Sequence, residues 1–216
     1  MAKKVMVSKI IHYQLITYLT YKMIEILIQH INDKIENKLT ESDINVLSEV
    51  FQPKKLRKHQ YLIQSGDVCK IAAFVVKGAL KKYTIDSTGK ENILELYIEN
   101  WWAGDKESFM IGTPTPYYID AYEDTELLVL TKENFVNKLS KQSFISELNN
   151  ILTERQSFQL MKRLHSSQTL TAEQKLEQLQ NSYPEFFQRF PQHIIASYLG
   201  MTKETLSRIR SNSLRK

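Results

Sequence analysis

A connection of only three residues, Gly200 to Thr202, separates two short helices that the sequence predicts near its C-terminal end. The first helix runs through "FPQHIIASYLG" and the second through "TKETLSRIR", where Thr202 caps the N-terminus. So short a connection forces the helices to cross steeply rather than lie antiparallel. Gly200 suits the left-handed conformation that ends the first helix. The side chains predicted to point inward are Ile195, Leu199, Met201, Leu206 and Ile209.

The second helix of this pair is polar over most of its surface, which indicates a binding role. Arg and Lys can donate hydrogen bonds to guanine, Glu can accept one from cytosine, and a helix of this width fits the major groove of DNA. Its N-terminus adds free N–H groups and partial positive charge, which suit phosphate. Small helical domains also bind protein, and this alternative stays open. The predicted DNA-binding residues are Thr202, Lys203, Glu204, Thr205, Ser207 and Arg208.

The distribution of charge agrees with a nucleic-acid partner. The chain of 216 residues carries a formal net charge of +5. Residues 1–22 hold 4 basic and no acidic side chains, residues 23–152 hold 15 basic and 19 acidic ones, and residues 153–216 hold 10 basic and 5 acidic ones. A basic C-terminal unit on an acidic body is typical of polyanion binding, because neutralised phosphates release counterions. The alternative is that these charges are solvated faces without a partner.

Upstream of this unit the hydrophobic pattern changes along the chain. Residues 23–36 and 40–51 have helical spacing, and Thr40 with Asp43 predicts a capping box for the second helix, which Pro53 stops. From residue 54 to residue 130 the pattern is that of short strands, with turns at Gly78 and in "DSTGKE". These strands predict an antiparallel jelly roll or barrel whose interior can hold one small ligand.

Helical spacing returns from residue 131 to residue 168, with two apolar strips. One strip can cover the barrel while the other meets a second copy of the chain, so we expect a dimerisation helix over residues 135–168. A single helix packed on its own body is the alternative, because Arg155, Lys162 and His165 make the seam imperfect. The residues predicted for the dimer helix are Phe144, Leu148, Ile151, Arg155 and Phe158.

The stretch "HIIASYLGMTKETLSRIR" resembles the DNA-binding end of the Crp/Fnr family of bacterial transcription regulators, and "KETLSR" lies where that family has its recognition-helix signature. The order of segments from about Met23 is also similar to the family's. The resemblance implies an α+β fold: a jelly-roll β-barrel sensor domain over residues 23–134, the dimerisation helix, and a helix-turn-helix domain over residues 169–216. It further implies a homodimer on a two-fold symmetric operator, RNA polymerase as a partner, and base contacts by Lys203, Glu204 and Arg208.

The sensor segment departs from the cyclic-nucleotide-binding members of that family, which grip the cyclic phosphate with a Gly-Glu pair and a later Arg-Ser pair. Here Gly104 and Asp105 match the first pair, but no arginine lies between Arg57 and Arg155. A buried phosphate without a guanidinium is poorly compensated, so we expect no productive binding of cyclic AMP or cyclic GMP. The candidates for an unknown effector pocket, or alternatively for packed core, are Trp101, Trp102, Gly104, Asp105, Phe109, Tyr117 and Tyr118.

Other functions have little support in the sequence. The single cysteine, Cys69, allows neither an internal disulfide nor a four-cysteine iron–sulfur cluster, and the five histidines lack the spacing of haem or zinc ligands. No catalytic constellation is recognisable, so we expect no enzyme. Neither a membrane span nor a secretory signal is predicted, which favours the cytoplasm. Residues 1–22 are either a native extension or the product of an upstream start. The alternative function is an effector-binding barrel whose helical tail contacts protein.

Overall fold

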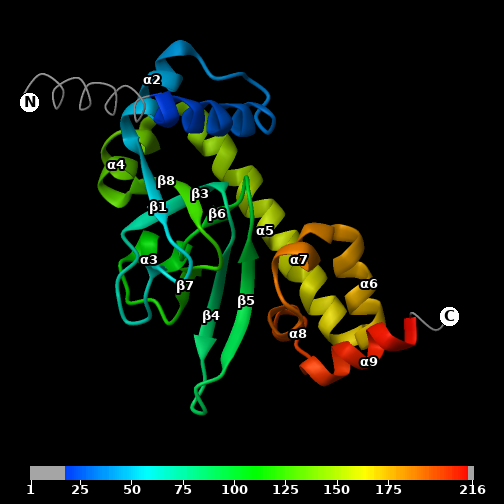
Figure 1. Cartoon of the computed structure of the whole chain (residues 1–216). Helices are drawn as coiled ribbons and strands as arrows, with labels where there is room; N and C mark the ends of the chain where they lie inside the picture. The colour runs from blue at the N-terminus through cyan, green and yellow to red at the C-terminus, as the bar shows by residue number, and fades with distance from the viewer. Residues whose placement is uncertain (1–17, 214–216) are drawn as a thin grey trace, which may run out of the picture.

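The computed structural model describes residues 18–213 (Figure 1). Two facing sheets and the helices around them lie beside a C-terminal group of helices. We call the part with the sheets, residues 18–142, the sensor, after the role expected for it, and residues 171–213 the C-terminal unit. The long helix α5, Ser143–Thr169, runs from the sensor to the C-terminal group. Residues 1–17 of the predicted N-terminal extension lie outside the described residues, and residues 18–22 begin a helix that continues to residue 32.

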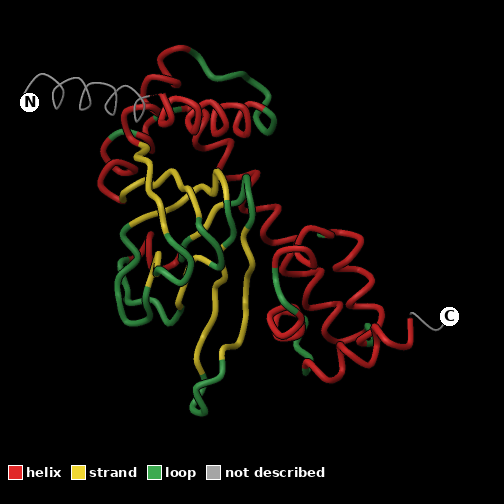
Figure 2. The backbone as a smooth tube through the Cα atoms, in the orientation of Figure 1, coloured by secondary structure: helices red, strands yellow, loops and turns green. Residues whose placement is uncertain are grey.

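The sensor contains two antiparallel sheets of four strands, drawn in yellow in Figure 2. The first sheet has the strand order β1-β8-β3-β6 and the second has the order β2-β7-β4-β5. This confirms the α+β fold with jelly-roll sheets, although the two sheets remain separate and do not close into a barrel. The strands are β1 (Phe51–Leu56), β2 (Tyr61–Ile63), β3 (Ile71–Lys77), β4 (Leu80–Ile85), β5 (Glu91–Tyr97), β6 (Trp102–Ala103), β7 (Tyr118–Ala121) and β8 (Thr125–Thr131).

The chain passes from the first sheet to the second at Gly78, as the sequence predicts. Gly78 has φ +106°, and a Cβ atom there would lie 2.5 Å from Thr125 Oγ1 and 2.8 Å from the Asp124 carbonyl oxygen. Only glycine fits, because a side chain would meet both the unfavourable φ and these atoms. The following strands β4 and β5 form a long hairpin whose tip, residues 86–90, extends beyond the rest of the sensor (Figure 1).

Helices cover the outer face of the first sheet. The helix of residues 18–32, α2 (Glu41–Val50) and the first turns of α5 share one apolar core with Phe51, Phe74 and Leu128. The predicted capping box of α2 is confirmed, since Thr40 and Asp43 exchange hydrogen bonds with each other's backbone N–H. The remaining short elements of the sensor are α3 (Lys106–Ile111), α4 (Lys132–Asn137) and the 3₁₀ turn η1 (Leu139–Lys141).

Two predicted helix boundaries are wrong. Phe51 belongs to β1 rather than to the preceding helix, because it pairs with Leu130 of β8; Pro53 is tolerated since β1 is an edge strand of the first sheet. The expected helix from residue 131 is interrupted by η1 and by Gln142, whose extended backbone precedes the start of α5. The dimerisation helix expected over residues 135–168 is therefore shorter at its N-terminus.

Within the described residues, the C-terminal unit contains four helices: α6 (Ala172–Ser182), α7 (Pro184–Arg189), α8 (Gln192–Tyr198) and α9 (Lys203–Ser213). The sequence analysis predicts α8 and α9 but not α7, which begins at Pro184, a residue type that suits the first turn of a helix. The unit packs through α8 against β5, so its core continues into the outer face of the second sheet.

Candidate nucleic-acid interface

The helix pair α8 and α9 has the geometry of a helix-turn-helix. Gly200 takes the left-handed conformation with φ +69°, and the Thr202 hydroxyl oxygen accepts a hydrogen bond from the Thr205 N–H over 3.2 Å. Leu206 and Ile209 are buried in the core of the unit together with Ile195, as predicted. These two residues fix the rotation of α9 about its axis, so that its opposite face is directed outward.

The outward face of α9 carries the side chains expected to bind DNA. Lys203, Glu204, Ser207 and Arg208 are exposed, whereas Thr205 is half-buried. The carboxylate of Glu204 accepts hydrogen bonds from its own backbone N–H and from the Thr202 hydroxyl, and these bonds lower its pKa. Glu204 is therefore ionised at neutral pH and able to accept from a base.

The N-terminal turn of α9 is separated from the sensor by a hollow. This hollow has a volume of about 860 Å³, and its walls include Lys203 and Glu204 on one side and Lys90 and Glu91 of the hairpin on the other. The most extensive contact between a helix of the unit and a strand of the sensor is that of α8 with β5. Lys203 and Glu204, which are expected to bind DNA, are exposed at the edge of the hollow.

The seven residues predicted for an effector pocket do not come together in one place. Trp101 and Trp102 are consecutive and lie in different cores: Trp101 contacts Tyr183 and Phe186 of the C-terminal unit, and Trp102 contacts Phe51 and Phe74. Tyr118 stacks on Tyr83 in the core that the second sheet shares with that unit, whereas Phe109 lies in the core between the sheets, against Phe135. These placements favour the packing alternative for the aromatic set.

Gly104 and Asp105, the match to the family's first phosphate-binding pair, have local structural roles. Asp105 is buried and caps α3, accepting hydrogen bonds from the backbone N–H groups of Glu107 and Ser108. Its carboxylate is therefore already engaged. Lys106 is exposed and donates to Thr153 Oγ1 of α5 over 2.7 Å.

Lys82 is a cation near the space between the sheets that the sequence analysis does not identify. Lys82 of β4 lies on the same face of its strand as Leu80, which belongs to the core between the sheets. Its Nζ lies 3.9 Å from Glu95 Oε1 and 4.2 Å from the centre of the Tyr117 ring. The Tyr97 hydroxyl also donates to Glu95, and burial raises the pKa of Tyr97. The alternation of β4 is the signal that could have placed Lys82 there.

The five residues predicted for the dimer helix fall into a group packed in the chain's own core and an exposed group. Phe144 and Leu148 are buried in the chain's own sensor core, and Ile151 packs at its edge. Arg155 and Phe158 are exposed, and the side chain of Phe158 is 65% accessible. Three further apolar residues of this second half, Leu160, Met161 and Leu164, are also exposed.

The described residues contain neither a group of three metal-binding side chains nor a helix long and apolar enough to span a membrane. Within residues 18–213, no three His, Cys, Asp or Glu side chains are grouped so that they could bind a metal ion. Cys69 is buried, and burial raises the pKa of its thiol. No helix in the same range has the length and apolarity to cross a membrane.

Comparison with known proteins agrees with this architecture. Residues 53–142 match the family model of the cyclic nucleotide-binding domain. The chain is 26% identical over 185 residues to the fumarate and nitrate reduction regulatory protein of Vibrio cholerae, covering 79% of this chain and 72% of that protein. It is 28% identical over 185 residues to the fumarate nitrate reduction regulatory protein of Klebsiella oxytoca, with the same two coverages.

Two solved structures share the fold. FixK2 from Bradyrhizobium japonicum superposes with a TM-score of 0.61 at 18% identity, covering 76% of this chain and 84% of that one. The regulator CLP from Xanthomonas campestris, described as responsive to c-di-GMP, gives 0.63 at 12% identity, covering 82% and 92%. A sensor of the cyclic-nucleotide-binding type joined to a helix-turn-helix defines a class of regulatory protein. These likenesses agree with the resemblance to the Crp/Fnr family of bacterial transcription regulators: over most of its length the chain is similar to the fumarate and nitrate reduction regulatory proteins, and it shares the fold of the two solved structures.

Proposed function

We propose that this protein is a homodimer that binds a two-fold symmetric sequence of double-stranded DNA through α9. The observation that carries the proposal is the division of α9 into two faces: Leu206 and Ile209 are buried, while Lys203, Glu204 and Arg208 are exposed. Such a helix can enter the major groove with its polar face against the bases. Thr202, Thr205 and Ser207 complete the proposed interface, through hydrogen bonds to bases or to phosphates.

The second half of α5 supports the homodimer. Phe158 and Met161 are three residues apart and therefore share one side of the helix, where both are more than 60% exposed. Contiguous exposed apolar side chains of this kind mark interaction sites. A second copy, packed along α5 at Phe158 and Arg155, would cover them and place two reading helices on one duplex. Phe144, Leu148 and Ile151 would then support this contact from within each sensor core.

A titration of double-stranded DNA at several salt concentrations tests DNA binding. Because each phosphate contact releases counterions, log Kd is expected to rise with log salt by about 0.9 per contact. A two-fold symmetric site, obtained by selection from random DNA, is expected to bind more tightly than its scrambled version at every salt concentration. Affinity that is independent of salt, or equal for both sequences, would favour the alternative function, an effector-binding sensor whose helical tail contacts protein.

The proposed effector of the sensor is a small molecule other than cyclic AMP or cyclic GMP. No arginine lies between Arg57 and Arg155, and the buried Lys82 of β4 already lies beside Glu95. Thermal unfolding of the protein with either cyclic nucleotide is expected to show no shift. Stabilisation of about 2.7 kcal/mol at a hundred times Kd would contradict this expectation.

The rest of the proposed biology is drawn from the resemblance to these regulatory proteins. The protein acts in the cytoplasm, where the proposed partners are DNA and RNA polymerase, and it carries neither haem nor an iron–sulfur cluster. Its single cysteine supports the last point, since such clusters take four cysteine ligands. Regulation rather than catalysis is proposed, in keeping with the regulatory relatives.

A further inference from the structure

The C-terminal unit is joined to α5 by a short link that does not fix its orientation. Helix α5 ends at Thr169, Leu170 is extended with φ −91° and ψ 143°, and Thr171 already caps α6. A link of two residues fixes the distance between α5 and α6 but leaves rotation about several backbone bonds. The orientation of the unit is therefore set by non-covalent contacts. Some are made with α5, where Gln159 donates to the Tyr183 hydroxyl and Ser166 donates to Gln178, each over 2.8 Å, and the others are made with the sensor.

One set of these contacts lies along the hairpin. The Ser197 hydroxyl of α8 accepts a hydrogen bond from the Ile93 N–H over 3.0 Å and donates to the Glu91 carbonyl oxygen over 3.2 Å. Arg163 of α5 donates to the Leu94 carbonyl oxygen over 2.6 Å and lies 4.6 Å from the centre of the Tyr198 ring. Apolar contacts around Ile93 accompany them, but apolar surfaces are non-directional and allow the unit to pivot.

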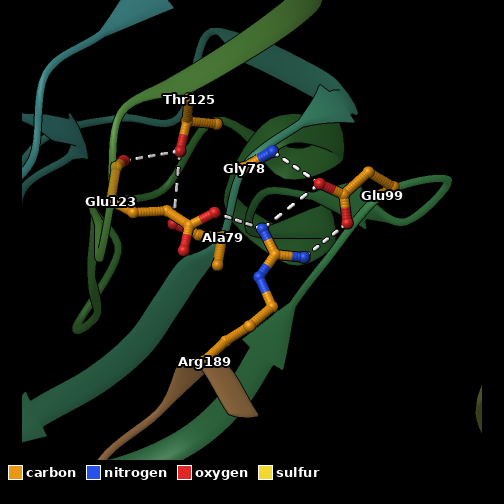
Figure 3. A network of polar contacts seen from close by, with 6 residues as sticks. All are labelled: Gly78, Ala79, Glu99, Glu123, Thr125 and Arg189. Carbon is orange, nitrogen blue, oxygen red and sulfur yellow. Dashed lines mark hydrogen bonds and ion pairs between the residues drawn. The ribbon is translucent and has the colours of Figure 1, made fainter. Parts of the chain in front are cut away.

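The second set of contacts is made by Arg189, the last residue of α7, and is drawn in Figure 3. Its guanidinium forms ion pairs with two sensor carboxylates: Glu99 lies between β5 and β6, and Glu123 lies between β7 and β8. Nη2 of Arg189 lies 3.2 Å from Glu99 Oε1, which also accepts the Gly78 N–H over 2.7 Å. One side chain of the C-terminal unit thereby binds two sensor segments directly, and a third segment, at Gly78, is joined to it through Glu99.

The network around Arg189 is held in place on the sensor side. Thr125 Oγ1 donates to the Glu123 carbonyl oxygen over 2.8 Å, and it lies 3.3 Å from the Ala79 carbonyl oxygen. Burial raises the pKa of Glu99, but hydrogen bonds from Arg189 and from the Gly78 N–H outweigh it and lower the pKa overall. Planar, bidentate arginine–carboxylate contacts fix direction as well as distance.

We infer that Arg189 is a positioning residue for DNA recognition: by binding Glu99 and Glu123 it fixes the orientation of the C-terminal unit on the sensor, and so sets the spacing between the two reading helices of the dimer. This inference rests on the proposed function. The ion pairs are partly exposed and therefore contribute little to stability. Their effect is to select one of the orientations that the link at Leu170 permits.

The test compares DNA sites that differ only in the separation of their half-sites. One site has half-sites about 10–10.5 bp apart or a multiple of this, as selected by the native protein, and the others carry insertions of one to five base pairs. The preference is the ratio of the affinity for the native spacing to the affinity for an altered spacing. We expect Arg189→Gln to reduce this ratio by about five- to tenfold, which is at the lower end of the effects by which one site in a protein changes the affinity of another. Binding to an isolated half-site is expected to stay unchanged.

Two further variants distinguish an effect of the orientation of the C-terminal unit from an effect of the protein's net charge. The double variant Glu99→Gln/Glu123→Gln makes the protein more positive, which would strengthen DNA binding non-specifically, yet it is expected to lose the spacing preference like Arg189→Gln. Lys77→Gln removes one positive charge next to Gly78, and it is expected to retain the preference. If Lys77→Gln behaves like Arg189→Gln, or if the double variant keeps its preference, the inference is wrong.

A measurement of orientation without DNA distinguishes failure of the inference from failure of the proposed function. Ser87→Cys on the hairpin tip and Asn181→Cys on α6 provide two exposed positions for dyes. The native Cys69 is only 2% exposed, so the dyes are expected to react with the two introduced cysteines. Single-molecule energy transfer is expected to give one narrow distance distribution for the native protein and a broader one for Arg189→Gln, with Arg189→Lys between them. An unchanged distribution in Arg189→Gln would overturn the inference even if DNA binds. Absence of DNA binding alongside the expected broadening would overturn only the proposed function.

Discussion

Replacing Arg208 with alanine is expected to weaken binding of the dimer to its preferred symmetric site by about 2–6 kcal/mol, since each of two copies loses about 1–3 kcal/mol of contact to a base. Arg208 is exposed on the outward face of α9, one residue before the buried Ile209, so its side chain is available to a guanine in the major groove. Competition binding at fixed salt, with the preferred site and with random DNA, measures this loss.

The matched control for Arg208 is Arg210→Ala on the same helix. Both changes remove one positive charge, but two residues along a helix correspond to about 200°, so the two side chains lie on different sides. On random DNA the two variants are expected to lose affinity equally, through the electrostatic contribution alone. On the preferred site only Arg208→Ala is expected to show the large loss. A loss for Arg208→Ala that is the same on both DNAs would identify Arg208 as a phosphate contact.

Replacing Phe186 with alanine is expected to destabilise the C-terminal unit by about 3–5 kcal/mol, the usual cost of deleting a fully buried aromatic side chain. Phe186 is 0% exposed. The centre of its ring lies within 6.0 Å of the ring centres of Trp101, Tyr183 and Tyr198, so it joins the sensor to the junction of α6 and α7 and to α8. The loss should reach DNA binding as well, because α9 depends on the same core.

Chemical denaturation followed by tryptophan fluorescence and by far-UV circular dichroism measures the effect of Phe186→Ala. The control is Phe187→Ala, which removes the same side chain from the neighbouring, half-buried position. We expect the free energy of unfolding to fall much less in this control. Equal effects of the two substitutions would show that Phe186 has no special place in the core shared by sensor and unit.

The sequence predicts those parts of the fold that depend on neighbouring residues. The turn at Gly200, the cap at Thr202 and the capping box at Thr40 each involve residues within three positions of one another, and the structure contains all of them. The inward positions Leu206 and Ile209 follow from helical spacing in the same way. This local information is sufficient to distinguish the buried face of α9 from the exposed face that is proposed to bind DNA.

The remaining features depend on residues that are far apart in the sequence. Phe51 continues a helical pattern, but pairing with β8 places it in a strand. The bonds from Arg189 join residues 90 and 66 positions apart, and no local pattern marks these three side chains as partners. The aromatic run at Trp101 and Trp102 indicates a cluster, yet alternation along the chain sends the two rings to different cores.

The central claim is that α9 of each copy reads one half of a symmetric site, and a hydroxyl-radical footprint on the selected DNA tests it most directly. We predict two protected segments related by a two-fold axis, with centres about 34–36 Å apart or a multiple of this, and two protein chains bound per duplex. A single, asymmetric protected segment with one chain bound, or uniform protection along any sequence, would contradict the account.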